Sequence, residues 1–376
     1  MINKEQIEFI KNNINADVRE LALKKGKVPF LNDFILTQIS SRQKAKKKLP
    51  NFYNNYDLIF PSSLSIQQSS SEQTAKYKSQ LINGEKLIDL TGGFGIDSYY
   101  FSKVVKSVDL IEIDGELSKI VNYNFDKINA KNINVLNADS EKVNLNSYNW
   151  IYIDPDRRKS GKKNFLIKDL KPDLNKIISA NIESKYLIKM SPMFEYEEFQ
   201  KQLIRPNQVL AVSLNGELKE LLFIIDNTEK YSLKSVAINN NIIDEYLFEE
   251  KTVEIGELKS FLIELDPSLM KLRLNDSFAS SNNLVKISSG TNYYTSDIIK
   301  KSNFTNNYEI ISVYDYKVKE LKKLFNKANI KSRNFIDRPE LIKKKLELED
   351  GGDVYLFFFK DQNGDYKCVE TKKAAN

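Results

Sequence analysis

Glycines and acidic residues stand where apolar runs of the sequence end, and these residue types can bind a nucleotide-like cofactor. The segment Asp89-Leu-Thr-Gly-Gly-Phe-Gly95 follows the run Lys86-Leu-Ile88 and leads into a helix-like stretch from Ile96. Glycine lets the backbone turn tightly and approach a ligand, and a helix N-terminus offers unpaired N–H groups. We therefore predict a strand, a glycine turn and a helix. The candidate cofactor-binding residues are Asp89, Thr91, Gly92, Gly93 and Gly95.

Three further acids follow later apolar runs, and each could accept hydrogen bonds from the ribose or adenine of an adenosyl cofactor. Glu112 lies 23 positions after Asp89, near the roughly 20 residues expected between a glycine turn and a ribose-binding acid. Asp139 follows the third run, and Asp154 ends the fourth, where the chain continues as Pro155-Asp-Arg-Arg158. A dehydrogenase would also use a glycine turn and an acid. Its usual Gly-x-Gly-x-x-Gly spacing is broken here by the adjacent Gly92 and Gly93, so an NAD site is the weaker interpretation.

The composition excludes several kinds of chemistry. The chain has 376 residues, no histidine and one cysteine, Cys368. Histidine acid–base catalysis, a Cys/His zinc site and an intramolecular disulfide are therefore impossible, and no metal is expected. We find no long apolar run and no signal-peptide core, which predicts a soluble, cytoplasmic protein without a membrane partner.

The charge balance permits a polyanionic partner without requiring one. Lys and Arg number 57 against 51 Asp and Glu, a net charge of +6. Basic residues cluster at 42–48, 157–163 and 343–345, but such a cluster is more often a solvated face than a ligand site. The sequence gives no indication of the oligomeric state.

The order of apolar patterns predicts an α/β protein with three domains. Residues 1–80 read as an N-terminal helical domain and linker; within them, Ser70 and Gln73 could instead cap a helix. Strand and helix patterns alternate over residues 81–247, where Asn215-Gly216 is a favoured hairpin turn. Residues 248–376 read as an α+β unit, with a helix between Val318 and Ala328. We expect residues 343–348 to begin its last strand pair, and a hairpin around Asn363-Gly364 to complete it.

Several segments together resemble a bacterial family of THUMP-like-domain methyltransferases, within the class I enzymes that use S-adenosylmethionine (SAM). The resemblance rests on Asp89–Asp97, Asp154–Arg158, Lys189-Met-Ser-Pro192, Gly216–Leu222, Arg333-Asn-Phe335 and Asp350-Gly-Gly-Asp353. It implies a Rossmann-like methyltransferase sheet with SAM as cofactor, held by Asp89, Gly93, Gly95, Glu112 and Asp139. THUMP domains bind RNA, so the resemblance also implies a structured RNA substrate such as tRNA or rRNA.

The segment from Asp154 to Arg157 holds the candidate catalytic residues. In enzymes that methylate amines, an Asp-Pro-Pro-aromatic motif binds the exocyclic amine and stacks the base. This chain keeps Asp154 and Pro155 but has Asp156 and Arg157 in the next two positions. N-methylation is therefore plausible, whereas the C5 route is unlikely because Lys189-Met-Ser-Pro192 lacks the cysteine nucleophile found there in enzymes that methylate C5 of pyrimidines.

Three residues of the same region are candidates for RNA binding. Arg157 and Arg158 could grip phosphates, although an ion pair with Asp156 is equally favoured. Phe165 could stack a base, but burial is favoured. A non-catalytic RNA-binding or assembly protein on a methyltransferase scaffold is the alternative from a different class. A protein or small-molecule acceptor is a further possibility, and the extra domains at both ends count against a small molecule.

Overall fold

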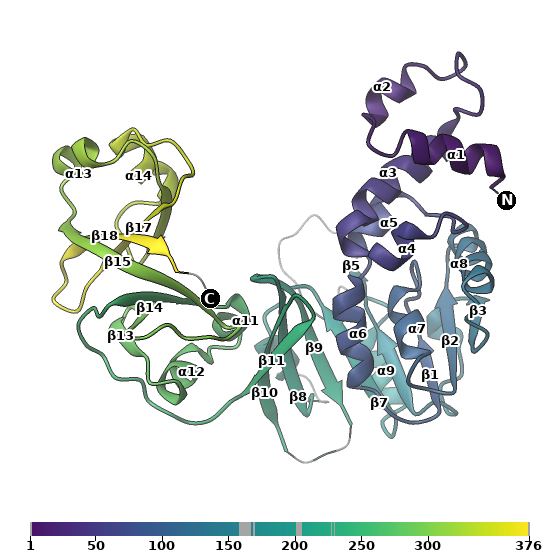
Figure 1. Ribbon diagram of the computed structural model, residues 1–376. Helices are drawn as coiled ribbons and strands as arrows, with labels where there is room; N and C mark the ends of the chain where they lie inside the picture. Colours follow the sequence, from purple (N-terminus) through teal and green to yellow (C-terminus); the bar gives the residue numbers. More distant parts are fainter. Residues whose placement is uncertain are drawn as a thin grey trace. The chain divides into compact units, whose positions relative to one another are not determined.

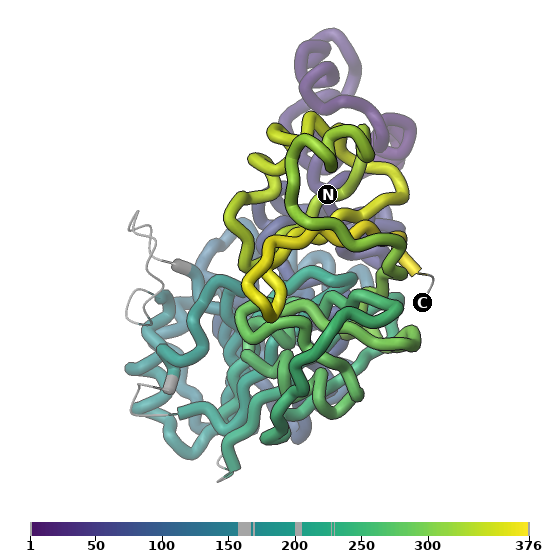
Figure 2. The backbone as a smooth tube through the Cα atoms, turned by 90° about the vertical axis from the view of Figure 1, so that its left-hand side faces the viewer, coloured from purple at the N-terminus to yellow at the C-terminus, as the bar shows by residue number. Residues whose placement is uncertain are grey.

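The computed structural model describes residues 2–157, 167, 170–200, 205–226, 228 and 230–374, without the side chains of residues 157 and 200. Figure 2 traces this backbone, with the remaining residues in grey. The chain divides into two compact units, residues 1–208 with 222–231 and residues 209–221 with 232–376. The boundaries predicted at residues 80 and 247 stay predictions. In the described part of the chain, no helix is both long and apolar enough to cross a membrane.

Helices make up the N-terminal part of the first unit, as predicted. Pro50 is the first residue of a helix, a position that suits proline because its missing N–H is not needed there. The polar stretch 61–79 contains two helices, and Ser71 rather than Ser70 caps the second of them by accepting from the N–H of Thr74. The helices are α1 (Lys4–Asn12), α2 (Val18–Ala22), α3 (Asp33–Lys48), α4 (Pro50–Asn54), α5 (Ser63–Gln68) and α6 (Glu72–Gln80).

Strands and helices then alternate and build a sheet whose order is β11-β10-β8-β9-β7-β4-β1-β2-β3. Its first strands are parallel and have the predicted positions: β1 (Lys86–Asp89), β2 (Ser107–Glu112), β3 (Ile133–Asn137), β4 (Trp150–Ile153) and β7 (Lys185–Met190). The helices after these strands are α7 (Ile96–Phe101), α8 (Gly115–Lys127), the short 3₁₀ helix η1 (Ser140–Lys142), α9 (Leu174–Ala180) and α10 (Glu197–Gln200). Two short strands, β5 (Asp156–Arg157) and β6 (Leu170–Lys171), pair separately.

A single apolar core joins the helical region to this sheet. Figure 1 shows α6 and α7 side by side in front of the parallel strands. Phe52 and Phe60 of the helical region contact Phe94 of the glycine turn, with ring centroids 6.0 and 5.5 Å apart. The turn that carries the candidate cofactor residues is therefore supported by buried aromatic side chains of the N-terminal helices.

Asn-containing turns make the last part of the sheet antiparallel. β8 (Gln208–Leu214) and β9 (Glu217–Ile225) are joined at Asn215 and Gly216, which have φ angles of 53° and 77°. These left-handed conformations are those a tight hairpin needs, so the predicted hairpin is confirmed. β10 (Ser232–Asn239) and β11 (Ile242–Leu247) form a second hairpin through Asn240 and Asn241.

The C-terminal part of the second unit has a seven-stranded sheet in the order β13-β14-β12-β15-β18-β17-β16. The predicted Asn363-Gly364 hairpin is confirmed, since β17 (Val354–Lys360) and β18 (Tyr366–Lys373) pair around it. The strand predicted at 343–348 is wrong, because residues 343–346 belong to α14 (Pro339–Leu346), which buries Ile342 and Leu346, and the helix is capped at Glu347. The other elements are β12 (Phe261–Leu265), α11 (Pro267–Lys271), α12 (Asn275–Ser281), β13 (Val285–Ser288), β14 (Thr291–Ser296), β15 (Thr305–Asp315), α13 (Val318–Leu324) and β16 (Asn329–Arg333).

Candidate active site

The glycine turn lies at the carboxyl end of β1 and has almost no room for side chains. A Cβ at Gly92 would lie 2.2 Å from the Leu110 side chain, and one at Gly95 would lie 2.7 Å from Phe125. Gly95 also has a φ of 78° where α7 begins. Gly93 differs, because a Cβ there would have no neighbour nearer than the Thr91 carbonyl oxygen at 3.8 Å. Gly92 and Gly95 therefore set the turn, whereas Gly93 borders open space.

Asp89 is the last residue of β1, and its side chain forms hydrogen bonds that stabilise the glycine turn. Its carboxylate accepts hydrogen bonds from the Thr91 N–H at 3.0 Å and the Ser98 hydroxyl at 2.6 Å, and its side chain is buried. Burial raises the pKa of Asp89 to about 7, although the Ser98 and Thr91 hydrogen bonds lower it; the charges of Asp97 and Asp154 raise it further. Asp89 is thus a buried support of the turn.

This elevated pKa predicts a specific pH dependence of stability. The folded-state pKa exceeds the unfolded value, so the contribution of Asp89 is complete below about pH 4 and is lost as pH rises through 7. Between pH 5 and 8 we expect the free energy of unfolding to fall by about 2–3 kcal/mol through this group. Urea denaturation at both pH values should show a smaller fall for Asp89→Asn. The exposed Asp126→Asn should keep the wild-type difference, and an unchanged difference in Asp89→Asn would contradict the assignment.

Glu112 ends β2 beside the turn, as predicted. One of its carboxylate oxygens accepts from the Gly93 N–H at 2.8 Å, and the other accepts from the Asp114 N–H at 2.8 Å. Its neighbour Ile113 is 74% exposed. Glu112 therefore joins the turn after β1 to the loop after β2, with an exposed apolar side chain next to it.

Asp139 follows β3 and is engaged with its own short helix. It caps η1 by accepting from the Glu141 N–H at 3.1 Å, and it forms an ion pair with Lys142 at 3.4 Å. The Glu141 hydrogen bond holds the pKa of Asp139 below its usual value, with Lys142 adding to the effect. In contrast to Glu112, Asp139 makes no hydrogen bond to the glycine turn within the described residues.

Asp154 follows β4 and is joined to both neighbouring strands. Its N–H donates to the Thr91 hydroxyl at 2.7 Å, and its carboxylate forms an ion pair with Lys189 at the end of β7. The side chains of Asp154 and Lys189 are 33% and 13% exposed. Because β1, β4 and β7 are adjacent parallel strands, their carboxyl ends bring these three residues together.

A buried ion pair that the sequence did not predict lies between α6 and α7. The Lys78 Nζ is 3.0 Å from Asp97 Oδ1, with 0% of the Lys78 side chain exposed. The second oxygen of Asp97 accepts from the hydroxyls of Ser70 at 2.7 Å and Tyr152 at 2.8 Å. Burial raises the pKa of Asp97, but Lys78 and Lys189 lower it more, so it lies below the usual value. Asp97 and Lys189 do stand in the segments that carry the family resemblance, whereas no local pattern marks Lys78.

Some of the remaining predicted residues lie within the part of the chain that the structure describes, and others do not. Pro155 is half-buried and Asp156 is exposed, and the backbone of Asp156 and Arg157 forms β5. Arg158 and Phe165 lie outside the described residues. In the basic cluster at 42–48, Arg42 is buried, so it does not belong to an exposed patch.

Comparison with known proteins agrees with this architecture. Residues 306–372 match the family model described as THUMP domain-like. Along its whole length the chain resembles the crystal structure of a putative methyltransferase from Porphyromonas gingivalis W83, with a TM-score of 0.83, 24% sequence identity and 100% of both chains covered. The chain has a class I methyltransferase fold with a THUMP-like domain near its C-terminus. The predicted fold class and family resemblance are thereby confirmed.

Two other solved structures are similar over a smaller part of the chain. The 16S rRNA N2 G1207 methyltransferase of T. thermophilus has a TM-score of 0.35 and 15% identity, covering 44% of this chain and 45% of that chain. The tRNA (uracil-54, C5)-methyltransferase of Pyrococcus abyssi has a TM-score of 0.33 and 16% identity, covering 45% and 40%. A search of the curated proteins finds no match.

Proposed function

We propose that this protein is a SAM-dependent methyltransferase that methylates a base in structured RNA, tRNA or rRNA. The observation that carries this proposal is the meeting of the glycine turn, Glu112 and Asp154 at the carboxyl ends of adjacent strands. Hydrogen bonds from Gly93 to Glu112 and from Asp154 to Thr91 connect them. Ligands of open α/β sheets bind at this edge.

The residues at this edge fit SAM. Gly93 leaves open space where a Cβ would otherwise stand, so a ligand can approach the backbone closely. The Glu112 carboxylate can accept hydrogen bonds from ribose hydroxyls, and exposed Ile113 offers an apolar surface for the adenine. Asp139, Thr91 and Asp89 would complete the binding site, with Asp89 acting through the turn that it supports. When bound, SAM supplies an electrophilic methyl group.

We assign Asp154 to binding the group that receives the methyl. Methyl transfer requires the acceptor atom to be aligned with the methyl group, and an amine that is methylated must lose a proton. A carboxylate at Asp154 can accept a hydrogen bond from such an amine and orient it. Lys189 and the Thr91 hydroxyl hold Asp154 in place from the two neighbouring strands. In the same proposal Pro155, Asp156 and Arg157 border the acceptor, and Arg157, Arg158 and Phe165 contact RNA.

N-methylation is favoured over C5-methylation of a pyrimidine. C5 chemistry needs a cysteine nucleophile, and the turn after β7 reads Met190-Ser191-Pro192. The sole cysteine, Cys368, lies in β18 and is buried, and this burial raises the pKa of its thiol far above the usual range. Buried thiols of this kind are inert rather than nucleophilic.

A non-catalytic RNA-binding or assembly protein is the second candidate. It is favoured by Asp156 and Arg157, which replace the proline and aromatic residue of amine-methylating enzymes. A wild-type protein that does not bind SAM would support this candidate.

Replacing Glu112 with alanine should weaken SAM binding about 10- to 100-fold, because charge-assisted hydrogen bonds contribute about 1.5–3 kcal/mol. Isothermal titration calorimetry with SAM measures this loss. Glu116→Ala is the matched control, since Glu116 is an exposed glutamate paired with Lys119 on α8. Equal affinities in the two variants would contradict the proposed ribose contact.

Transfer of labelled methyl groups from SAM tests the function itself. Total RNA from cells that lack this gene keeps the target site unmodified and therefore serves as the acceptor. Label in RNA, followed by digestion to nucleosides, would establish the activity and name the product. SAM binding without labelled RNA would point to another acceptor.

A further inference from the structure

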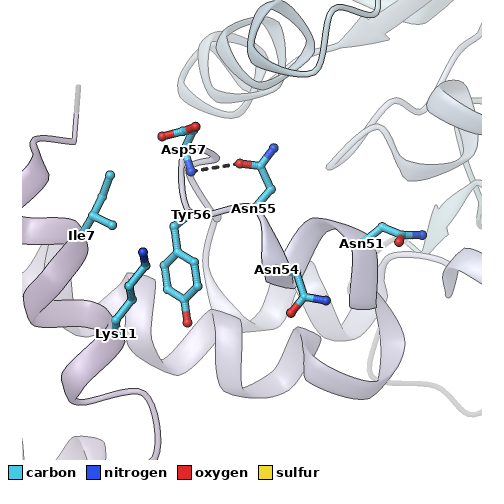
Figure 3. A pocket seen from close by; sticks show the side chains of 7 residues that line it. All are labelled: Ile7, Lys11, Asn51, Asn54, Asn55, Tyr56 and Asp57. Atoms are coloured by element: carbon cyan, nitrogen blue, oxygen red, sulfur yellow. Dashed lines mark hydrogen bonds between the residues drawn. The ribbon is translucent and has the colours of Figure 1, made fainter.

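A pocket in the N-terminal helical region is lined by residues that do not belong to the candidate active site. It has a volume of about 480 Å³ and opens between α1 and the segment that follows α4 (Figure 3). Polar groups predominate among the side chains that surround it. Those used below are Lys11, Asn54, Asn55, Tyr56 and Asp57.

The pocket lies in a positively charged part of the chain. Residues 1–57 contain 11 Lys and Arg but 6 Asp and Glu, a net charge of +5 in a chain whose total is +6. On α1, Lys4, Ile7 and Lys11 fall on one face by helical spacing, and Ile7 and Lys11 line the pocket. Exposed Lys46 follows Arg42 by one turn of α3. Such a surface attracts a polyanion.

A buried arginine fixes the wall of the pocket and adds charge beneath it. The Arg42 guanidinium donates to the carbonyls of Tyr53, Asn55 and Leu58 at 3.1, 3.2 and 2.7 Å, and it stacks on the Tyr56 ring at 4.6 Å. Burial lowers the pKa of Arg42 to about 10, and Tyr56 is the largest of the groups that raise it, so the guanidinium remains cationic at pH 7. The wall is therefore preorganised, with its positive charge retained.

Amide groups on this wall are available to a ligand. The Asn55 side-chain oxygen accepts from the Asp57 N–H at 3.0 Å, which leaves its NH₂ group as a donor (Figure 3). Asn54 is exposed and makes no side-chain hydrogen bond within the part of the chain that the structure describes. Amides offer both a donor and an acceptor, as the polar edge of a nucleobase requires. Asp57 also lines the pocket, and its carboxylate can accept from a base amino group or a ribose hydroxyl.

We propose that this pocket binds a nucleotide of the RNA substrate, with the phosphate at Lys11 and the base edge at Asn54 and Asn55. This site rests on the proposed RNA acceptor and would anchor the substrate away from the reacting base. The Lys11 ammonium lies 4.9 Å from the Tyr56 ring centre on an exposed, flexible side chain, so it can turn toward a phosphate. Phosphate contacts of this kind position an RNA without reading its sequence.

Fluorescence anisotropy with a labelled, mixed-sequence 12-nucleotide single-stranded RNA tests the site on the full chain. We expect Lys11→Gln/Asn54→Ala to bind about 10-fold more weakly at 50 mM salt. The slope of log K against log salt should be about 0.7 less negative, because one phosphate contact is lost. The matched control, Lys24→Gln/Asn12→Ala, changes exposed residues of the same types outside the pocket and should stay within about twofold of wild type. Lys11→Arg should retain binding, and the melting temperature should be the same in every variant.

Three results would overturn the proposal. Equal weakening in both double variants would show general electrostatic attraction rather than a site; labelled RNA formed by the wild type would then leave the methyltransferase proposal standing. No RNA binding by the wild type, with methyl transfer to another acceptor, would reject the RNA substrate together with the pocket. Tighter binding to phosphatidylglycerol vesicles than to RNA, lost in Lys11→Gln/Asn54→Ala, would assign the pocket to a lipid surface.

Discussion

Replacing Lys78 with methionine should lower the free energy of unfolding by about 3–5 kcal/mol, because it removes the cation that is paired directly with the buried Asp97 carboxylate. The Lys78 ammonium is 3.0 Å from Asp97, and its side chain is completely buried between α6 and α7. The hydroxyls of Ser70 and Tyr152 would still donate to Asp97. Two neutral donors do not replace the charge of a cation beside a carboxylate that is largely buried. Urea denaturation followed by circular dichroism measures the loss.

Two further variants separate the ion pair from simple loss of a lysine. Lys119→Met breaks the exposed pair with Glu116, where the side chains are 75% and 83% accessible, and should leave the free energy of unfolding nearly unchanged. The double variant Lys78→Met/Asp97→Asn removes both charges and should recover most of the stability. If it remained as unstable as Lys78→Met, packing of the lysine stem rather than charge would explain the effect.

The parts of this fold that could be predicted are those specified by short sequence patterns. The strand before Asp89 and the Asn215-Gly216 turn depend on apolar runs and on backbone conformations that few residues adopt. Asn215 and Gly216 both have positive φ, which explains why the pair marks a hairpin so well. The positions of Glu112 and Asp154 followed from the same logic, since acids at strand ends meet at one edge of a parallel sheet.

The wrong strand prediction concerns a segment in which a strand pattern and a helix pattern compete. The segment 343–348 was predicted as a strand, yet Pro339 suits the first position of a helix. The buried residues Ile342 and Leu346 of α14 are four positions apart, as one helical face requires. The three lysines between them, residues 343–345, make this apolar spacing hard to recognise in the sequence. The helical period of Ile342 and Leu346 therefore outweighs the strand pattern in this segment.

The ion pair of Lys78 and Asp97 could not be read from local pattern at all. The two residues are 19 positions apart and meet only because α6 packs beside α7. A lysine on a helix with charged neighbours is usually solvated, and burial is decided by tertiary packing. Arg42 is the same case, because its guanidinium is enclosed by carbonyls more than ten residues away.

Replacing Asp154 with asparagine should lower the rate of methyl transfer about 10²- to 10⁴-fold, the usual effect of removing a positioned proton acceptor. Asparagine has nearly the same shape, and the Asp154 N–H that donates to Thr91 belongs to the backbone, so the local structure should persist. We therefore expect SAM affinity to stay within a few-fold of wild type. Single-turnover transfer of labelled methyl into RNA from the deletion strain, together with calorimetric titration of SAM, separates the two quantities.

Asp156→Asn is the matched control for this prediction. Asp156 is a carboxylate two positions further along the chain, with an exposed side chain, and it belongs to β5. A large rate loss in Asp154→Asn and a small one in Asp156→Asn would place the proton acceptor at the end of β4. The reverse order would place it beyond Pro155. Full rates in both variants would mean that the methylated group loses its proton to water. That result would fit methylation of a ring nitrogen or a hydroxyl better than methylation of an exocyclic amine.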